Sequence, residues 1–286
     1  MAKLIPLYSS SSGNSVYISF GNEAVLVDCG TNAKRILTAL SEHDIDPETI
    51  KAIFITHAHN DHISALSVLN KKLKKPIIAS KDTLDYLCNN NIVNKDTKLI
   101  DVTSKNVDLG FVGAEFIPTS HDCKGSGGFK FNFGEKSVSV CTDLGVVTDS
   151  VRKALIGSEV VYFESNHDIN MLTKGPYPPY LKQRILSEHG HLSNNACASE
   201  LPLLLQMYTF NDKEDLTNYL KNIKAFKNDF LEAIAFEKKR QELQLGYSKE
   251  ILEDTISQIE DILNENGEEY FTGETEIAMT DISRFV

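Results

Sequence analysis

Short stretches of apolar and polar residues alternate along this chain, and turn-forming residues separate them. Apolar residues at helical spacing predict helices over 32–42, 61–70 and 83–88. Apolar or alternating runs predict strands. These strands are expected at 4–8, 16–20, 24–28, 52–56, 76–79, 98–102, 113–117, 128–133, 137–141 and 159–164. The mixture contains a large share of strands, which favours an α/β fold of two packed sheets with helices outside.

From Ala196 onward the pattern changes to long helices. Apolar residues recur at spacings of three and four over 216–234 and again over 249–264, which indicates helices with one apolar face. Such faces are more often packing surfaces than ligand sites. The sequence contains no internal repeat and no flexible linker, so residues 1–286 are predicted to form a single domain.

The most informative polar stretch is Thr-His-Ala-His-Asn-Asp-His at 56–62, directly after an apolar run. An apolar run that ends at a histidine cluster is typical of a buried strand that delivers ligands into a loop. His and Asp side chains bind Zn²⁺ and similar divalent ions. On an extended segment His57 and His59 point to the same side and can hold one ion. Asp61 and His62 are then free for a second ion or for water. A polar loop rich in histidine by chance is the alternative, but three of the eight histidines fall here.

The pattern His-x-His-x-Asp-His after a hydrophobic strand resembles the signature of the metallo-beta-lactamase superfamily. Asp28 is similar to the aspartate that braces the metal loop in that superfamily. His121 resembles its third metal histidine, and Asp143 resembles the carboxylate that bridges two metals. Three more strings, at 10–15, 163–168 and 190–194, resemble the YycJ (WalJ) group of bacterial proteins. The resemblance covers about residues 3–197 and breaks down beyond them.

The resemblance implies an αββα sandwich with the metals at one edge of the two sheets and extra helices near the C-terminus. It implies one or two divalent ions, with zinc first and manganese or iron as alternatives. The expected ligands are His57, His59, Asp61, His62, His121 and Asp143. Residues 196–265 are expected to be a divergent helical insertion that either caps the active site or forms a homodimer contact.

The main departure from this group is a missing histidine. Superfamily members usually provide one more metal histidine late in the chain, but no histidine follows His191 here. The second site is then weak, completed by His191 or His167, or empty. His57, His59 and His121 would remain as a first site, a common catalytic zinc arrangement with an open position for water.

The same resemblance assigns roles to single residues. Asp61 is expected to orient the water that a divalent ion activates. His191 lies in a string similar to the proton-donating histidine motif of tRNA-processing nucleases, which implies that it protonates the leaving group. The alternative is a structural hydrogen bond at a helix start, with Ser193 or Asn194 as the cap. Glu164 and His167 follow a predicted strand and are candidates for orienting ligands.

Other polar features have simpler explanations. The Ser/Gly/Asn run at 9–15 is expected to be a hairpin turn near the metal site. Cys29 and Cys141 adjoin ligand-bearing motifs, but both follow apolar strands, which favours small buried residues over ligands. Lys182 and Arg184 are either contacts for a substrate phosphate or two solvated charges on a helix.

Charge and cysteine content limit the partners that the protein can bind and the compartment in which it is expected. Of the net charge of −11, residues 196–286 carry −10, from nine Lys/Arg against 19 Asp/Glu. Extensive phosphate contacts normally require a basic surface, so broad duplex binding is not expected. Five scattered cysteines without a CxxC pair favour a reducing cytoplasm. No apolar stretch is long enough to predict a membrane helix.

These features favour a metal-dependent phosphodiesterase or exonuclease-like nuclease that acts on nucleic-acid ends or small phosphodiesters. Hydrolysis of a small ester, lactone or lactam is the first alternative. A metal-poor, non-catalytic relative is the second, because of the missing histidine. Asp61 and Asp143 count against a non-catalytic relative, because a protein that binds no metal would not be expected to keep two carboxylates beside three histidines.

Overall fold

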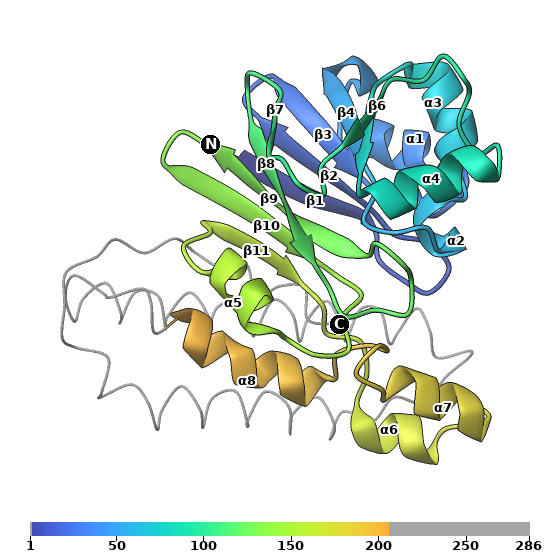
Figure 1. The fold of residues 1–286 in the computed structure, drawn as a ribbon, viewed down its shortest axis with the longest axis vertical. Helices are drawn as coiled ribbons and strands as arrows, with labels where there is room; N and C mark the ends of the chain where they lie inside the picture. The colour runs from blue at the N-terminus through green and yellow to red at the C-terminus, as the bar shows by residue number, and fades with distance from the viewer. Residues whose placement is uncertain (1, 206–286) are drawn as a thin grey trace.

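Two β-sheets packed face to face form the centre of the computed structural model, which describes residues 2–205 (Figure 1). The first sheet contains β1 (Ala2–Tyr8), β2 (Ser15–Phe20), β3 (Glu23–Val27), β4 (Ile50–Phe54), β5 (Ile77–Ala79) and β6 (Leu99–Asp101), in that order. Its first three strands are antiparallel, and β3 to β6 are parallel.

The second sheet has the order β11-β10-β9-β8-β7. It contains β7 (Val107–Asp108), β8 (Gly113–Pro118), β9 (Gly127–Phe133), β10 (Lys136–Cys141) and β11 (Val160–Phe163). All of its neighbours are antiparallel except β10 and β11. The predicted strands are confirmed, with small shifts at their ends, and among the strands of residues 2–205 only the short β7 was not predicted.

Helices cover the outer faces of both sheets, which confirms the αββα arrangement. The helices are α1 (Ala33–Glu42), α2 (Asn60–Ile63), α3 (Leu66–Leu73), α4 (Lys81–Asn89), α5 (Asp149–Leu155), α6 (Ile169–Lys174), α7 (Pro179–Ile185) and α8 (Asn194–Leu205), with a 3-10 turn, η1, at Pro47–Thr49. Helices α1, α3 and α4 lie on the first sheet, and α5 and α8 lie on the second, whereas α6 and α7 sit together at the lower right of Figure 1. None of the described helices has the length and apolarity that a membrane span requires.

Alternation along the strands divides the core into layers. In β3, Ala24 and Leu26 pack under the outer helices, whereas Val25 and Val27 face the other sheet. This is the two-residue period of a strand buried on both faces. Between the sheets, the ring of Phe54 packs edge-on against Phe129 and Phe131, with centroid separations of 5.0 and 4.9 Å. The last residue of β4 is therefore fixed in the core just before the histidine loop begins.

The structure corrects one predicted helix and adds others. The helix expected over 61–70 is two helices, α2 and α3, separated by Ser64 and Ala65. The Ser64 hydroxyl donates to the carbonyl of Gly30 (2.7 Å), and the backbone N–H of Ala65 donates to that of Cys29 (2.8 Å). These bonds to a distant loop interrupt the helix. Helices α5 and α6 were not predicted, because they are short and lack a long apolar period. Helix α7 was expected only as the helix that carries Lys182 and Arg184. Most of the predicted 196–265 insertion lies outside the described residues, which include only its start in α8.

Candidate metal centre

The predicted ligands come from three loops at one edge of the sandwich. Residues 55–59 leave β4, and His59 is the N-cap of α2, which carries Asp61 and His62. His121 follows β8, and Asp143 follows β10. Strands β8 and β10 both pair antiparallel with β9, so their carboxyl ends lie at the same edge. The structure brings His57, His59, His62, His121, Asp143 and His191 together in groups of potential ligands. Asp61 is outside these groups, with its Oδ2 3.5 Å from Nε2 of His62.

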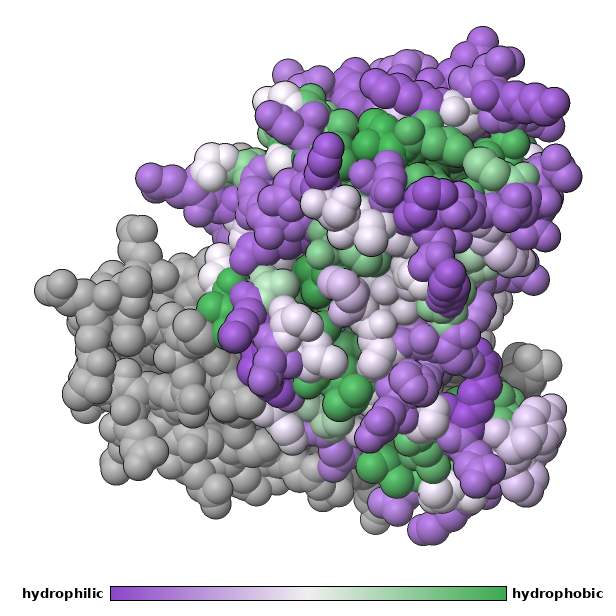
Figure 2. Space-filling view, in the orientation of Figure 1, coloured by the Kyte–Doolittle hydropathy of each residue, from purple (hydrophilic) through white to green (hydrophobic). Residues whose placement is uncertain are grey.

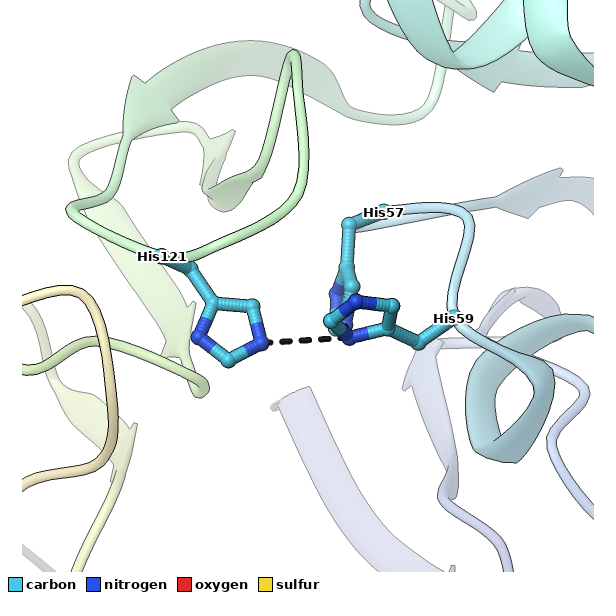
Figure 3. Close-up of side chains that lie close together, drawn as sticks. All are labelled: His57, His59 and His121. Atoms are coloured by element: carbon cyan, nitrogen blue, oxygen red, sulfur yellow. Dashed lines mark hydrogen bonds between the residues drawn. The ribbon is translucent and has the colours of Figure 1, made fainter. Parts of the chain in front are cut away.

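Three histidines form the first cluster. His57, His59 and His121 each offer a ring nitrogen, and these nitrogens all lie within 4.8 Å of one another (Figure 3). Nδ1 of His59 is 3.0 Å from Nε2 of His57 and 3.2 Å from Nε2 of His121. Tetrahedral Zn–N bonds of about 2.0–2.1 Å place two ligand nitrogens roughly 3.3 Å apart. The spacing therefore fits a divalent ion held between the three rings.

Electrostatics in this cluster also suit metal binding. Burial lowers the pKa of His57 well below its ordinary value, and burial likewise lowers the pKa of His59 and His121. Lowered pKa values keep the rings neutral at neutral pH. A neutral imidazole is the form that binds a metal, because a protonated ring has no free lone pair.

Asp143 connects the first cluster to two further groups. Asp143 forms one group of potential ligands with His57 and His62, and another with His121 and His191. Its Oδ2 lies 3.2 Å from Nε2 of His62, and its Oδ1 lies 3.5 Å from Nδ1 of His191. Burial opposes ionisation of Asp143, but the neighbouring His62 holds its pKa well below the ordinary value. The carboxylate therefore takes part in two of the groups that could hold a metal ion.

Asp28 braces the histidine loop, as the sequence predicted. Its Oδ1 accepts a hydrogen bond from the backbone N–H of Thr56 (2.9 Å), and its Oδ2 accepts one from the Thr56 hydroxyl (2.8 Å). The same Oδ2 lies 2.8 Å from Nδ1 of His62. A carboxylate that holds one ring nitrogen orients the histidine and directs the other nitrogen toward a metal.

A buried glutamate holds His191 at the centre. Oε1 of Glu164 lies 2.7 Å from Nδ1 of His191, and Oε2 accepts a hydrogen bond from the backbone N–H of Leu144 (2.7 Å). Burial lowers the pKa of His191, but the hydrogen bond to Glu164 together with the charges of Glu164 and Asp143 outweighs burial and raises that pKa overall. The cap at the start of α8 is Ser193, whose hydroxyl accepts from the N–H of Ala196 (3.1 Å). Ser193 is thus the cap that the structural alternative for His191 named, while His191 itself contacts Glu164.

His167 stands apart from these groups. Among the described residues it joins no cluster of potential ligands, and neither of its ring nitrogens has a hydrogen-bond partner. Cys29 and Cys141 are fully buried and also lie outside the clusters. Burial raises the pKa of both thiols well above the ordinary value, which confirms the interpretation of small core residues.

Sequence reasoning missed the part that Asn14 plays. The run at 9–15 does make a turn, since the N–H of Gly13 donates to the carbonyl of Ser10 (3.0 Å). The Asn14 side chain, however, donates to Oδ2 of Asp61 (3.3 Å) and lies 3.1 Å from Nε2 of His62. Its backbone N–H donates to the carbonyl of Asp61 (2.8 Å). The only signal in the sequence was the place of Asn14 inside a string that resembles the YycJ group.

Gly30 permits this close approach of the loops. A Cβ at that position would lie 1.4 Å from the carbonyl oxygen of Asp61 and 2.6 Å from the backbone nitrogen of Asn14. No side chain fits in that space, so a glycine is required where the turn, the loop after β3 and α2 meet.

Comparison with known proteins gives a consistent picture. The sequence profile of the Metallo-beta-lactamase superfamily matches residues 10–174. Exodeoxyribonuclease WalJ of Streptococcus pneumoniae D39 is 36% identical over 191 residues, which cover 66% of this chain and 71% of that protein. Exodeoxyribonuclease YycJ of Bacillus anthracis is 32% identical over 195 residues, which cover 67% and 73%.

Solved structures share the fold at lower identity. The short form of human tRNase Z superimposes with a TM-score of 0.53 and 20% identity, over 71% of this chain and 89% of that one. A diphosphatase from the PhnP family gives a TM-score of 0.53 and 18% identity, over 71% and 83%. At these identities the likeness concerns the arrangement of the sheets and helices.

Proposed function

The chain belongs to the metallo-beta-lactamase superfamily, and we propose that it hydrolyses phosphodiester bonds at the ends of nucleic-acid strands at the centre around His57, His59 and His121. It is a metal-dependent hydrolase of the nuclease or phosphodiesterase type, as the exodeoxyribonucleases among its relatives support. The observation that carries the proposal is the contact between Glu164 and His191 beside a cluster of three histidines.

Divalent-metal binding agrees with the fold and with the donor groups of the centre. We propose zinc as the native ion, because neutral imidazole nitrogens at this spacing suit it, with manganese or iron as alternatives. The ligands of the first ion are His57, His59 and His121. Asp61, His62 and the bridging Asp143 would hold a second. A bound ion supplies a Lewis acid and a water of lowered pKa.

We assign to Asp61 the role of orienting the attacking water. Its pKa is lowered: burial raises it, but the hydrogen bond and charge of His62 outweigh burial and keep the carboxyl ionised. Its contacts with Asn14 and with His62 both use Oδ2. Oδ1 is then available to orient the water and accept its proton.

We assign to His191 the role of donating a proton to the leaving group. Because Glu164 holds its Nδ1, the proton that it can deliver is on Nε2. The raised pKa of His191 favours the protonated ring. Departure of an alkoxide from phosphorus requires a proton, and a positioned imidazolium supplies it. The leaving groups of lactones and lactams need such a proton too, so the preference for phosphodiesters is supported by the exodeoxyribonucleases among the relatives.

Strand ends are the proposed substrate because of the charge distribution. Residues 1–195 hold 20 Lys/Arg against 21 Asp/Glu, so the catalytic part lacks the excess of cations that long duplexes attract. We also propose that residues 1–286 form one domain in the cytoplasm, with a homodimer contact or cap in the C-terminal helices. The residues that bear on that contact lie mostly outside 2–205.

The direct test is digestion of an end-labelled single strand by the metal-loaded protein. Our proposal predicts mononucleotides or short products released progressively from one end, and no release by Asp61→Ala. Release of labelled fragments only from internal positions would contradict action on strand ends. Absence of any product, together with opening of lactones, would contradict the nuclease assignment itself.

A further inference from the structure

The segment made of α6, α7 and the loop between them exposes two tyrosines. Seven large hydrophobic side chains are exposed among the described residues, and four of them lie within 169–186. These are Ile169, Tyr177, Tyr180 and Leu186, with Tyr180 exposed by 73% and Tyr177 by 53%. Figure 2 shows green and pale atoms among hydrophilic ones at the lower right, where α6 and α7 lie.

The same segment is basic in an acidic chain. Residues 169–187 contain Lys174, Lys182 and Arg184 and no Asp or Glu, although the whole chain has a net charge of −11. Asp168, just before the segment, caps α6 by accepting from the N–H of Met171 (2.7 Å). The combination of exposed tyrosines and cations is the composition that proteins use to bind unpaired nucleic acid.

Hydrogen bonds hold this segment in place. The ammonium group of Lys182 on α7 donates to the carbonyl of Thr173 on α6 (2.6 Å), which ties the two helices together. Leu172 anchors α6 in the interior. Directly after α7, the N–H of His191 donates to the carbonyl of Ile185 (2.9 Å). The tyrosines are thus carried by a fixed platform.

The platform is also joined to the metal centre. Arg184 on α7 donates from Nε and Nη2 to the carboxylate of Asp122, at 2.5 and 3.1 Å. Oδ1 of Asp122 lies 3.6 Å from Nε2 of His59. Nδ1 of His121 lies 3.1 Å from the carbonyl oxygen of Gly190, in the loop that follows α7. A strand lying on α6 and α7 would therefore end at the ligands.

We propose that the surface of Tyr177, Tyr180, Lys174 and Lys182 holds an unpaired DNA strand and leads its end to the metal centre. This inference rests on the proposed function, which supplies the strand as substrate. The tyrosines stack on bases, which only an unpaired strand exposes. Lys174 and Lys182 meet its phosphates, whereas the charge of Arg184 is shared with Asp122. Two such lysines are too few to hold a duplex by its backbone alone.

The test is binding of a fluorescent phosphorothioate single strand to the full, metal-loaded chain. Removal of a stacking tyrosine weakens binding by about tenfold, so Tyr177→Ala with Tyr180→Ala should weaken it about a hundredfold. Both side chains are exposed, and thermal unfolding and metal content verify that the fold is retained. Tyr86→Ala, an exposed tyrosine on α4, is the matched control and should bind like the parent.

A second measurement tests the lysines. Replacing Lys174 and Lys182 by Gln should reduce the slope of log affinity against log salt by about 0.7 for each phosphate that is no longer neutralised. The tyrosine variants should raise KM for strand digestion more than they lower kcat. An unaltered slope together with an unaltered KM would overturn the proposal.

Other results of the binding experiment would also overturn the proposed binding surface. Equal binding by the parent and the double tyrosine variant would overturn the proposal, as would equal losses in the Tyr86→Ala control. Tighter tyrosine-dependent binding of RNA or of duplex DNA would overturn the choice of unpaired DNA. Hydrolysis of bis-p-nitrophenyl phosphate by the parent tests the proposed function separately. A parent that binds the strand through its tyrosines but hydrolyses no phosphodiester would refute that function and leave the binding surface standing.

Discussion

Nδ1 of His62 lies 2.8 Å from Oδ2 of Asp28, and both residues are buried. The contact joins the loop after β3 to α2 and points the other nitrogen of His62 toward Asp143, at 3.2 Å. The two carboxylates outweigh the effect of burial and hold the pKa of His62 well above its ordinary value. One aspartate therefore fixes the backbone of the histidine loop and the orientation of a ligand.

Replacing this aspartate should affect stability and metal affinity together. Removing one partner of a buried pair leaves the other without compensation, so Asp28→Ala should lower the free energy of unfolding by about 3–5 kcal/mol. Metal affinity should fall by about 10–100-fold, because the orientation of His62 is lost. Urea unfolding and metal titration measure the two effects.

The matched control for that variant is Asp85→Ala. Asp85 forms an exposed ion pair with Lys81 on α4, and exposed pairs contribute only about 0–1 kcal/mol. If Asp28→Ala proves no more destabilising than Asp85→Ala, Asp28 is not the brace that the contacts indicate.

Metal content should depend on the three-histidine cluster. The double variant His57→Ala, His59→Ala should lose the tightly held ion, since two of three neutral nitrogen ligands are removed. His43→Ala, at the exposed end of α1, should keep the metal content of the parent. Elemental analysis after gel filtration measures this. Equal metal content in the parent and the double variant would refute the assignment of these ligands.

Two ions should differ in affinity. No histidine follows His191, so the second ion relies on Asp61, His62 and Asp143 unless His191 contributes as well. Dialysis against a mild chelator should remove one equivalent first and leave the other bound. Two ions that are lost together, with one affinity, would point to a further ligand for the second ion.

His191 should act on the leaving group more than on metal binding. His191→Ala should slow alkyl phosphodiesters by about 10²–10⁴-fold, because an alkoxide needs a proton, while aryl esters with good leaving groups should be slowed much less. His189→Ala, at an exposed histidine two positions earlier, is the control. A loss of bound metal in His191→Ala, with equal slowing of both ester types, would make His191 a ligand instead.

Much of this architecture could be predicted from local patterns. The apolar run of β3 predicted a strand, and the histidines after β4 predicted a metal loop, because both signals lie within a few neighbouring residues. The contact of Glu164 with His191 joins residues 27 positions apart, and that of Asn14 with Asp61 joins residues 47 apart. No periodicity reports such contacts. The break between α2 and α3 was missed for the same reason, since its cause is hydrogen bonding to Cys29 and Gly30.

The most direct test of the central claim compares two substrate classes with the metal-loaded protein. The rates to measure are those for bis-p-nitrophenyl phosphate and for a set of lactones, for the parent and for Asp61→Ala. We predict hydrolysis of the phosphodiester by the parent, little or no opening of lactones, and no phosphodiester turnover by a folded, metal-bearing Asp61→Ala protein. A parent that ignores the phosphodiester and opens lactones, or an Asp61→Ala variant as active as the parent, would contradict the claim.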